Sequence, residues 1–139
     1  GHGVAVAASG SDFAIAWTDS RSGTSEIYLV LVDALTGSLD GPVQVSTGST
    51  THKLSPRMIH DGQSLTVAWK DTPGGGSEVW FRRYGASLSA LGDAACATCL
   101  DGAAAGEFGL ASAGPNVYSV ATASSGGKYR FTRITCSGP

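Results

Sequence analysis

Two aspartates follow the same apolar, tryptophan-bearing segment in different parts of the chain. The segments read AIAWTDSRSG from Ala14 and TVAWKDTPGG from Thr66, and their aspartates, Asp19 and Asp71, lie 52 residues apart. An aspartate at the start of a turn commonly accepts hydrogen bonds from backbone N–H groups two residues on, and we expect this structural role first. The same carboxylates could contact a ligand or a cation. Asp19, Arg21 and Asp71 are therefore candidate ligand-binding residues.

Four further candidates lie in loops of polar or small residues. His52 and Lys53 belong to STGSTTHKLS, and Asp101 and Glu107 flank the segment LDGAAAGE. Two carboxylates at that spacing could bind a cation such as calcium, or act as an acid–base pair. The sequence shows no nucleophile elbow, phosphate-binding loop or zinc-ligand pattern. We therefore assign these four residues to ligand binding and predict no catalytic residue, no metal ligand set and no required cofactor.

Three cysteines form an odd set. Cys96 and Cys99 make the motif CATC, and Cys136 lies near the end of the sequence. A CxxC motif can be a redox pair or half of a metal site, but no second ligand pair and no helical pattern accompany this one. We predict one structural disulfide. All three pairings remain open, and the remaining cysteine would be free or intermolecular.

Composition limits the classes of partner. The chain has 139 residues, which suggests one domain, and a net charge of −2. Charged residues make up 14% of it, well below the usual quarter, and no basic stripe is present, so nucleic acid is not an expected partner. No apolar run approaches the roughly 20 residues of a membrane span. The abundance of Thr, Ser, Gly and Ala favours a secreted or extracellular protein.

The chain repeats itself. With a shift of 52 residues, SGSDFAIAWTD falls on DGQSLTVAWKD and SEIYLVLVD falls on SEVWFRRYG. Glu26 then meets Glu78, and because a single active site needs no copies, this recurrence indicates a repeated structural hydrogen bond. A second shift of 52 gives a fainter third copy, in which LTVA falls on VYSV (117–120). There WFRRY matches YRFTR (129–133), three residues early.

Each copy shows four short segments in which apolar and polar residues alternate with a period of two, the pattern of β-strands. The predicted first strands are Val4–Ala8, Pro56–His60 and Phe108–Ser112, and the second are Phe13–Thr18, Leu65–Lys70 and Val117–Thr122. The third are Ile27–Val32, Val79–Tyr84 and Tyr129–Ile134, and weaker fourth strands are Pro42–Ser46 and Ala94–Thr98. The three units span about 4–47, 56–99 and 108–139, and the last is incomplete.

Roughly 50 residues per four-stranded unit is typical of a β-propeller blade. The predicted fold is therefore all-β, with about three blades of four antiparallel strands in a single partial-propeller domain. In such a fold the first strands line the axis, and Trp17, Tyr28, Trp69 and Trp80 would fill the space between blades. About three blades cannot close a ring, so another chain must complete it. We favour a six-bladed homodimer; the alternative is a piece cleaved from a longer propeller.

The repeated pattern VAW-x-D-x-x-x-G…E-I/V-Y/W resembles the repeats of secreted bacterial six- to eight-bladed propellers. These include sialidase-like and related extracellular repeat proteins. The resemblance covers nearly the whole chain in its blade pattern, whereas the sialidase box S-x-D-x-G-x-T-W is absent. It implies a propeller fold whose second-to-third and fourth-to-first strand loops share the face that usually binds.

Three functions are compatible with these patterns. The first is a non-enzymatic binding or interaction module, lectin-like or on the cell surface, with a carbohydrate or protein ligand. In that case changes at Asp19 and Asp71 should weaken binding in parallel. The second is a glycoside hydrolase whose site is completed when the ring closes, with Asp101 and Glu107 as its carboxylates. The third is a structural fragment of a longer propeller.

Overall fold

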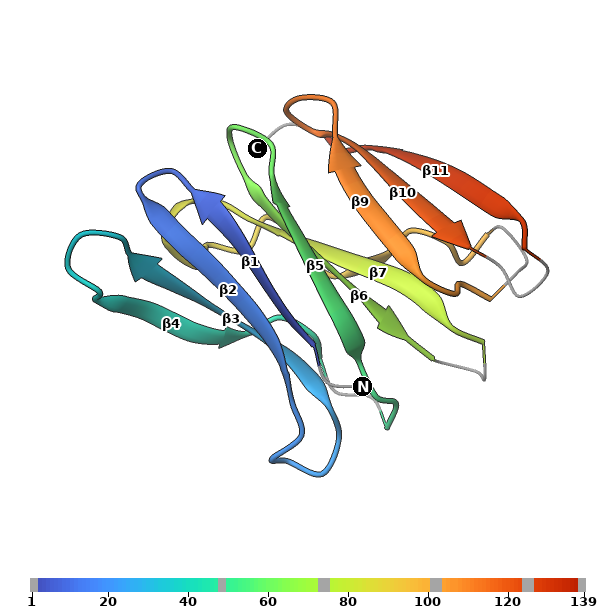
Figure 1. Cartoon of the computed structure of the whole chain (residues 1–139), viewed down its shortest axis with the longest axis horizontal. Coiled ribbons are helices and arrows are strands. Elements are labelled where there is room, and N and C mark those ends of the chain that lie inside the picture. Colours follow the sequence, from blue (N-terminus) through green and yellow to red (C-terminus); the bar gives the residue numbers. More distant parts are fainter. Residues whose placement is uncertain (1–2, 48–49, 73–75, 101–103, 124–126, 138–139) are drawn as a thin grey trace.

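The computed structural model describes residues 3–47, 50–72, 76–100, 104–123 and 127–137 (Figure 1). Over these residues the chain is all-β and forms three antiparallel sheets, one after another along the sequence. The strand orders are β1-β2-β3-β4, β5-β6-β7-β8 and β11-β10-β9. In the described part, no helix is both long enough and apolar enough to span a bilayer.

The strands of the first sheet are β1 (Val4–Ser9), β2 (Asp12–Asp19), β3 (Glu26–Asp33) and β4 (Leu39–Gln44). Those of the second are β5 (Leu54–His60), β6 (Leu65–Asp71), β7 (Glu78–Tyr84) and β8 (Ala95–Cys96), with the short 3₁₀ turn η2 (Ala86–Leu88) before β8. Those of the third are β9 (Phe108–Ser112), β10 (Val117–Ala123) and β11 (Tyr129–Thr135).

The first three strands of every repeat lie where the alternation predicts them, within two residues at each end. The fourth strands differ from the prediction. β4 begins three residues early, because the pairing of β3 with β4 shifts its register between Leu29 and Leu31. Gly41 makes this irregularity possible: its φ is +103°, and a Cβ there would lie 3.1 Å from the backbone oxygen of Leu29. β8 is only two residues long, because the chain first turns through η2 and bridges back from Ala90 to Tyr84.

The predicted alignment of the third copy is wrong by one residue in its second strand. His60 pairs with Leu65 across the turn of the second sheet, whereas Ser112 pairs with Tyr118 in the third, so that turn is one residue longer. The register shift in β10 is therefore 53, and Thr122 takes the position of Trp69. Because Thr122 pairs with Arg130 as Trp69 pairs with Trp80, the segment RFTRI (130–134) matches WFRRY, in place of YRFTR.

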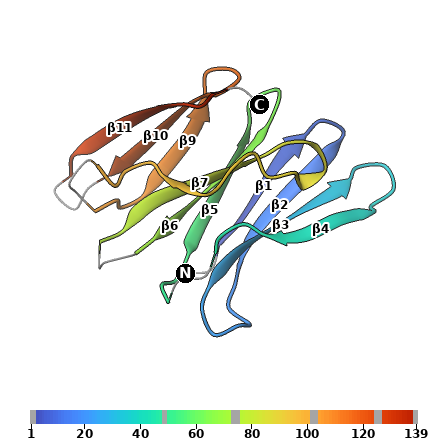
Figure 2. The ribbon, with the colours of Figure 1, turned by 180° about the vertical axis from the view of Figure 1, so that it is seen from behind.

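The sheets pack face to face in chain order, and their first strands β1, β5 and β9 lie side by side (Figures 1 and 2). One apolar cluster joins the first and second sheets. It includes Ala14, Ala16, Ile27 and Leu29 from the first and Leu65, Val67 and Trp69 from the second. Another cluster joins Ala68 and Val79 of the second sheet to Phe108 and Val120 of the third. Since neighbouring residues point to opposite faces, β6 is buried on both sides.

A polar network joins the second and third sheets at the end that carries the β5–β6 turn. Asp61 is 8% exposed and accepts hydrogen bonds from the hydroxyl of Tyr118 and from the backbone N–H of Asn116 (2.9 Å). Burial opposes ionisation of Asp61, but these bonds and those from the N–H groups of its own turn lower its pKa well below the usual range. Arg83 donates to the side chains of Asn116 and Ser64, and its guanidinium lies 5.6 Å from the ring centre of Tyr118.

Candidate functional site

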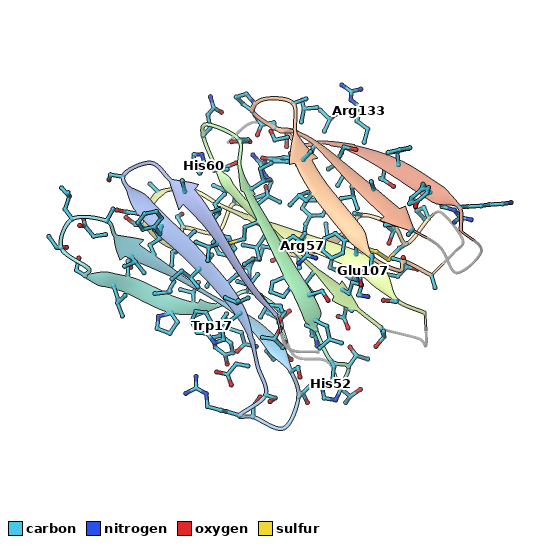
Figure 3. All side chains as sticks on the ribbon, in the orientation of Figure 1. Trp17, His52, Arg57, His60, Glu107 and Arg133 are labelled. Atoms are coloured by element: carbon cyan, nitrogen blue, oxygen red, sulfur yellow. A yellow bond between two sulfur atoms is a disulfide. The ribbon has the colours of Figure 1, made fainter. Side chains whose placement is uncertain are left out.

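The loops that follow the second and fourth strands lie at one end of the sheets, as antiparallel pairing requires. Six of the seven predicted ligand-binding residues belong to this end: Asp19, Arg21, His52, Lys53, Asp71 and Glu107. Figure 3 labels two of them, His52 and Glu107. Asp101 lies outside the described residues, so its predicted pairing with Glu107 stays a prediction.

A pocket of about 220 Å³ opens at this end between the first and second sheets. Its lining residues are Ser46, Thr47, Lys53, Trp69, Asp71, Trp80 and Ala94. We call it the two-tryptophan pocket. It brings together two of the predicted residues, Lys53 from the β4–β5 loop and Asp71 from the end of β6. Its walls come from a directly paired position of β6 and β7, because Trp69 faces Trp80 across the ladder.

A repeated hydrogen-bond motif fixes Ser46 at the edge of this pocket. Its hydroxyl donates to Glu26 and accepts from the backbone N–H of Ile27 at 2.8 Å. In the second repeat Thr98 makes the same pair of bonds to Glu78 and to the N–H of Val79, the latter at 3.0 Å. The predicted structural role of the recurring glutamates is thus confirmed.

Lys53 is buried beside this motif. Its side chain is 1% exposed, its ammonium lies 3.3 Å from Glu26 Oε1, and it donates to the carbonyl of Thr51 at 2.7 Å. The backbone N–H of Lys53 bonds to the carbonyl of Ser25 at 2.9 Å, and Ala105 makes the equivalent bond to Ser77 in the second repeat. The repeat therefore requires only the backbone at this position. The cation belongs to the first copy, and it gives the pocket a positive group.

Asp71 supplies the negative group. It is 7% exposed and accepts hydrogen bonds from the hydroxyl of Thr51 (2.5 Å) and the backbone N–H of Thr72 (2.8 Å). Trp69 and Trp80 each have a buried indole N–H with no acceptor among the described residues. An unsatisfied buried donor costs about 1–3 kcal/mol, so a ligand oxygen or water in reach of either indole would be stabilised. The pocket thus combines apolar walls with groups of both signs.

Asp19 and Arg21 form a separate pair and do not line the pocket. The side chain of Arg21 donates from Nε to both carboxylate oxygens of Asp19, at 3.0 and 2.7 Å, and its backbone N–H donates at 2.9 Å. The hydrogen bond from the Arg21 side chain is the main cause that lowers the pKa of Asp19 to about 2. The predicted turn role of Asp19, with an N–H donor two residues on, is confirmed.

His52 and Glu107 also lie outside the pocket. The Nδ1 of His52 is 3.2 Å from the backbone nitrogen of Ser25, which donates to it, and 3.0 Å from the Ser25 hydroxyl. Glu107 is exposed just before β9, and its carbonyl accepts from Ala123 at 2.9 Å. The structure thus places these two residues at the predicted end but does not bring their side chains to Lys53 and Asp71.

The structure resolves the open cysteine pairing. Cys96 and Cys99 form a disulfide, and Cys136 is unpaired, which confirms one disulfide with a third, free cysteine. A carboxylate oxygen of Glu78 lies within 4.8 Å of both disulfide sulfurs, an arrangement that could hold a metal ion if the thiols were free. The thiolate is the metal-binding form of cysteine, so the oxidised pair does not supply such a site.

The sequence pattern predicts that both pocket tryptophans lie between blades, but it does not identify them as walls of a site. Trp69 is 2% exposed, whereas Trp80 is only partly buried and next to polar loops. The position of Trp80 opposite Trp69, and one loop away from Asp71, is the sequence feature that could have identified it as a wall of the site.

A larger hollow of about 330 Å³ lies at the opposite end of the sheets. It is lined mainly by turns, among them Gly10, Ser11 and Gly85–Leu88. The described residues that line it include Asp12, His60 and Tyr84 but no lysine or arginine.

No family model, curated protein or solved structure matches the chain. The function is therefore inferred from the geometry of the described residues. Among the described residues, the two-tryptophan pocket combines aromatic walls with two of the predicted ligand-binding residues, Lys53 and Asp71.

Proposed function

We propose that the chain is part of a β-propeller that serves as a non-enzymatic binding module. Three consecutive antiparallel sheets of one repeated pattern, packed face to face with their first strands side by side, support this architecture. The proposal agrees with the resemblance to secreted propeller repeats, and we propose a secreted or extracellular location for the same reason. The sheets act as the scaffold, and the loop end presents the ligand site.

The proposed ligand site is the two-tryptophan pocket, and the proposed ligand is a small carbohydrate unit. At about 220 Å³ the pocket is below the roughly 300–1,000 Å³ of sites for drug-sized ligands, so it suits a single sugar residue. Trp80 offers an apolar surface to a sugar ring. Asp71 offers a carboxylate oxygen that accepts hydrogen bonds from hydroxyl groups, as in a lectin. This juxtaposition of aromatic wall and polar groups is the observation that carries the proposal.

Binding is favoured over glycoside hydrolysis by the number of free carboxylates. Hydrolysis of a glycosidic bond generally uses two carboxylates on either side of the bond. Among the described residues that line the pocket, Asp71 supplies the one carboxylate. Glu26 lies behind Ser46 and Lys53 and is engaged by both. The lining therefore offers recognition groups without an acid–base pair.

Titration of a panel of monosaccharides, followed by tryptophan fluorescence and calorimetry, tests the proposal. At least one sugar should bind saturably, and Asp71→Asn should weaken that binding by tenfold or more. Asp19→Asn is the matched control, because it changes the equivalent aspartate at the same end but outside the pocket. It should leave the affinity unchanged. No saturable binding, or equal losses in the two variants, would contradict this site.

A further inference from the structure

One face of the first sheet is apolar and uncovered. It is formed by Val4, Val6, Phe13, Ile15 and Trp17, and we call it the front face. Paired strands place these side chains together, since Val4 lies opposite Trp17 and Val6 lies opposite Ile15. Val4 is 65% exposed and Phe13 is 49% exposed. Large exposed apolar patches on a folded chain generally mark interaction surfaces.

The same positions in the second sheet are covered. Leu65, Val67 and Trp69, each 52 residues after a front-face residue, are at most 2% exposed and pack on the first sheet. The repeat therefore uses this face as an interface wherever a preceding sheet is present. The front face of the first sheet has the same residue pattern and has no sheet on it in this chain.

The opposite face of the third sheet is also uncovered. Its residues Ala121, Tyr129, Phe131 and Arg133 define what we call the back face. Tyr129 and Phe131 are 76% and 79% exposed. The equivalent residues of the second sheet, Val79, Phe81 and Arg83, face the third sheet; Val79 is fully buried and Phe81 packs on the second apolar cluster. Both internal interfaces thus join the back of one sheet to the front of the next.

We propose that a second copy of the chain docks its back face on this front face, and the reverse, so that two copies close a ring of six sheets. This inference rests on the propeller architecture proposed above. Propellers usually have four to eight blades, and six is the one multiple of three in that range. A head-to-tail contact closes when its rotation fits the ring and otherwise grows as a filament.

The internal interface indicates how the partner residues meet. Tyr118 of the third sheet lies beside Ser64 and Arg83 of the second. By the repeat register, Phe13 takes the place of Tyr118, and Val117 and Arg133 take the places of Ser64 and Arg83. Val117 and Arg133 line a largely apolar hollow of about 270 Å³ on the back face. We infer that Phe13 of the other copy fills it.

Mass measurement by light scattering after gel filtration tests the inference. The chain should have a mass of about 28 kDa, twice the 14.0 kDa of one copy. Phe131→Asp should reduce the mass to that of one copy. Leu35→Asp is the control, because Leu35 is also exposed (94%) but lies in the β3–β4 turn, away from both faces. It should stay at twice the chain mass.

A mixing experiment checks the orientation of the contact. Phe13→Asp damages the front face and Phe131→Asp damages the back face, so each variant alone should be monomeric. A mixture retains one intact front and one intact back, and it should form a pair of about 28 kDa. Wild-type protein that is monomeric at all concentrations, open-ended polymers, or a mixture that stays monomeric would overturn the inference.

The two proposals can fail separately. The two-tryptophan pocket lies within one chain, so a monomeric Phe131→Asp variant keeps it. Sugar binding by that variant without dimerisation of the wild type would contradict only the ring. Dimerisation without sugar binding would contradict only the ligand site. Because Phe131 is largely exposed in one copy, its replacement should not unfold the sheet, and near-ultraviolet circular dichroism verifies this.

Discussion

The first and second sheets carry the same tryptophan at the same repeat position, yet the two side chains have different surroundings. Trp69 is 2% exposed between two sheets. Trp17 is only partly buried and stacks on Tyr28, with ring centres 6.0 Å apart and planes at 23°. The strand pattern determines which way each indole points. The presence of a neighbouring sheet determines whether the indole is buried.

The polar groups of the two repeats also differ, but here the difference is in the residue type and not in the neighbouring sheet. The glutamate–hydroxyl motif is the same in both, but Glu26 has a buried lysine partner, whereas alanine stands at that position after Glu78. The feature that both repeats share, the glutamate–hydroxyl motif, is the one that joins the loop to the third strand. The two-tryptophan pocket is lined by Lys53, one of the residues that the repeat does not require.

The largest expected difference in the free energy of unfolding is between alanine substitutions of the two tryptophans, Trp69 and Trp17. In the monomeric Phe131→Asp background, Trp69→Ala should lower the free energy of unfolding by about 3–5 kcal/mol, because it leaves a cavity between packed sheets. Trp17→Ala should cost less than half as much, since its face is open. Urea unfolding measures both values. Equal losses would mean that the front face is already covered in a single chain.

The next effect concerns the buried lysine. Lys53→Met should cost about 3 kcal/mol, because it leaves the Glu26 carboxylate buried without a cation. The hydroxyl of Ser46 still donates to that carboxylate, which keeps the cost at the lower end of the usual range. Glu78→Gln, in the repeat without a lysine, should cost less. Urea unfolding at neutral pH distinguishes them, and a larger loss in Glu78→Gln would refute this ranking.

The smallest expected loss of stability concerns Asp61, which joins the second and third sheets. Because the pKa of Asp61 is lowered in the folded state, its stabilisation is present above the unfolded value of about 3.9 and is lost as the pH falls below it. Asp61→Asn should lower stability by about 1.5–3 kcal/mol at pH 7 and flatten the acid limb of the stability curve. Asp19→Asn, which alters an exposed pair, should leave the neutral-pH value nearly unchanged. An unaltered acid limb in Asp61→Asn would disprove the assignment.

Much of the strand pattern could be predicted from sequence because the alternation is strong. It located β2, β3, β6 and β7 to within a residue at each end. The third copy was misaligned because its β9–β10 turn has one extra residue, which the recurring Gly62 and Gly114 conceal. The limits of the weak fourth strands differ from the prediction for another reason, because they depend on pairing with the third strands. β4 begins three residues early beside β3, and β8 occupies only Ala95–Cys96 of the predicted Ala94–Thr98 beside β7.

The candidate site was predictable only in part. Turn chemistry identified Asp71, and loop position identified Lys53, but the pocket exists because the first and second sheets pack together. The strand pattern that precedes Asp71 and Asp19 does not distinguish the two aspartates. Their difference arises from Thr51 and from the neighbouring sheet in one case and from Arg21 in the other. The disulfide likewise depended on which cysteines the fold brings together.

The double burial of β6 has a consequence for how the molecule moves. In a single copy, the main packing contacts of the described residues join each sheet to the sheets next to it in the chain, so opening either terminal sheet breaks one interface and opening the middle sheet breaks two. In such arrays fluctuation begins at the ends and spreads inward. In a single copy, the backbone amide hydrogens of β6 should therefore be the slowest to exchange with solvent. The strand that holds Trp69 and Asp71 would stay closed while the outer sheets open locally.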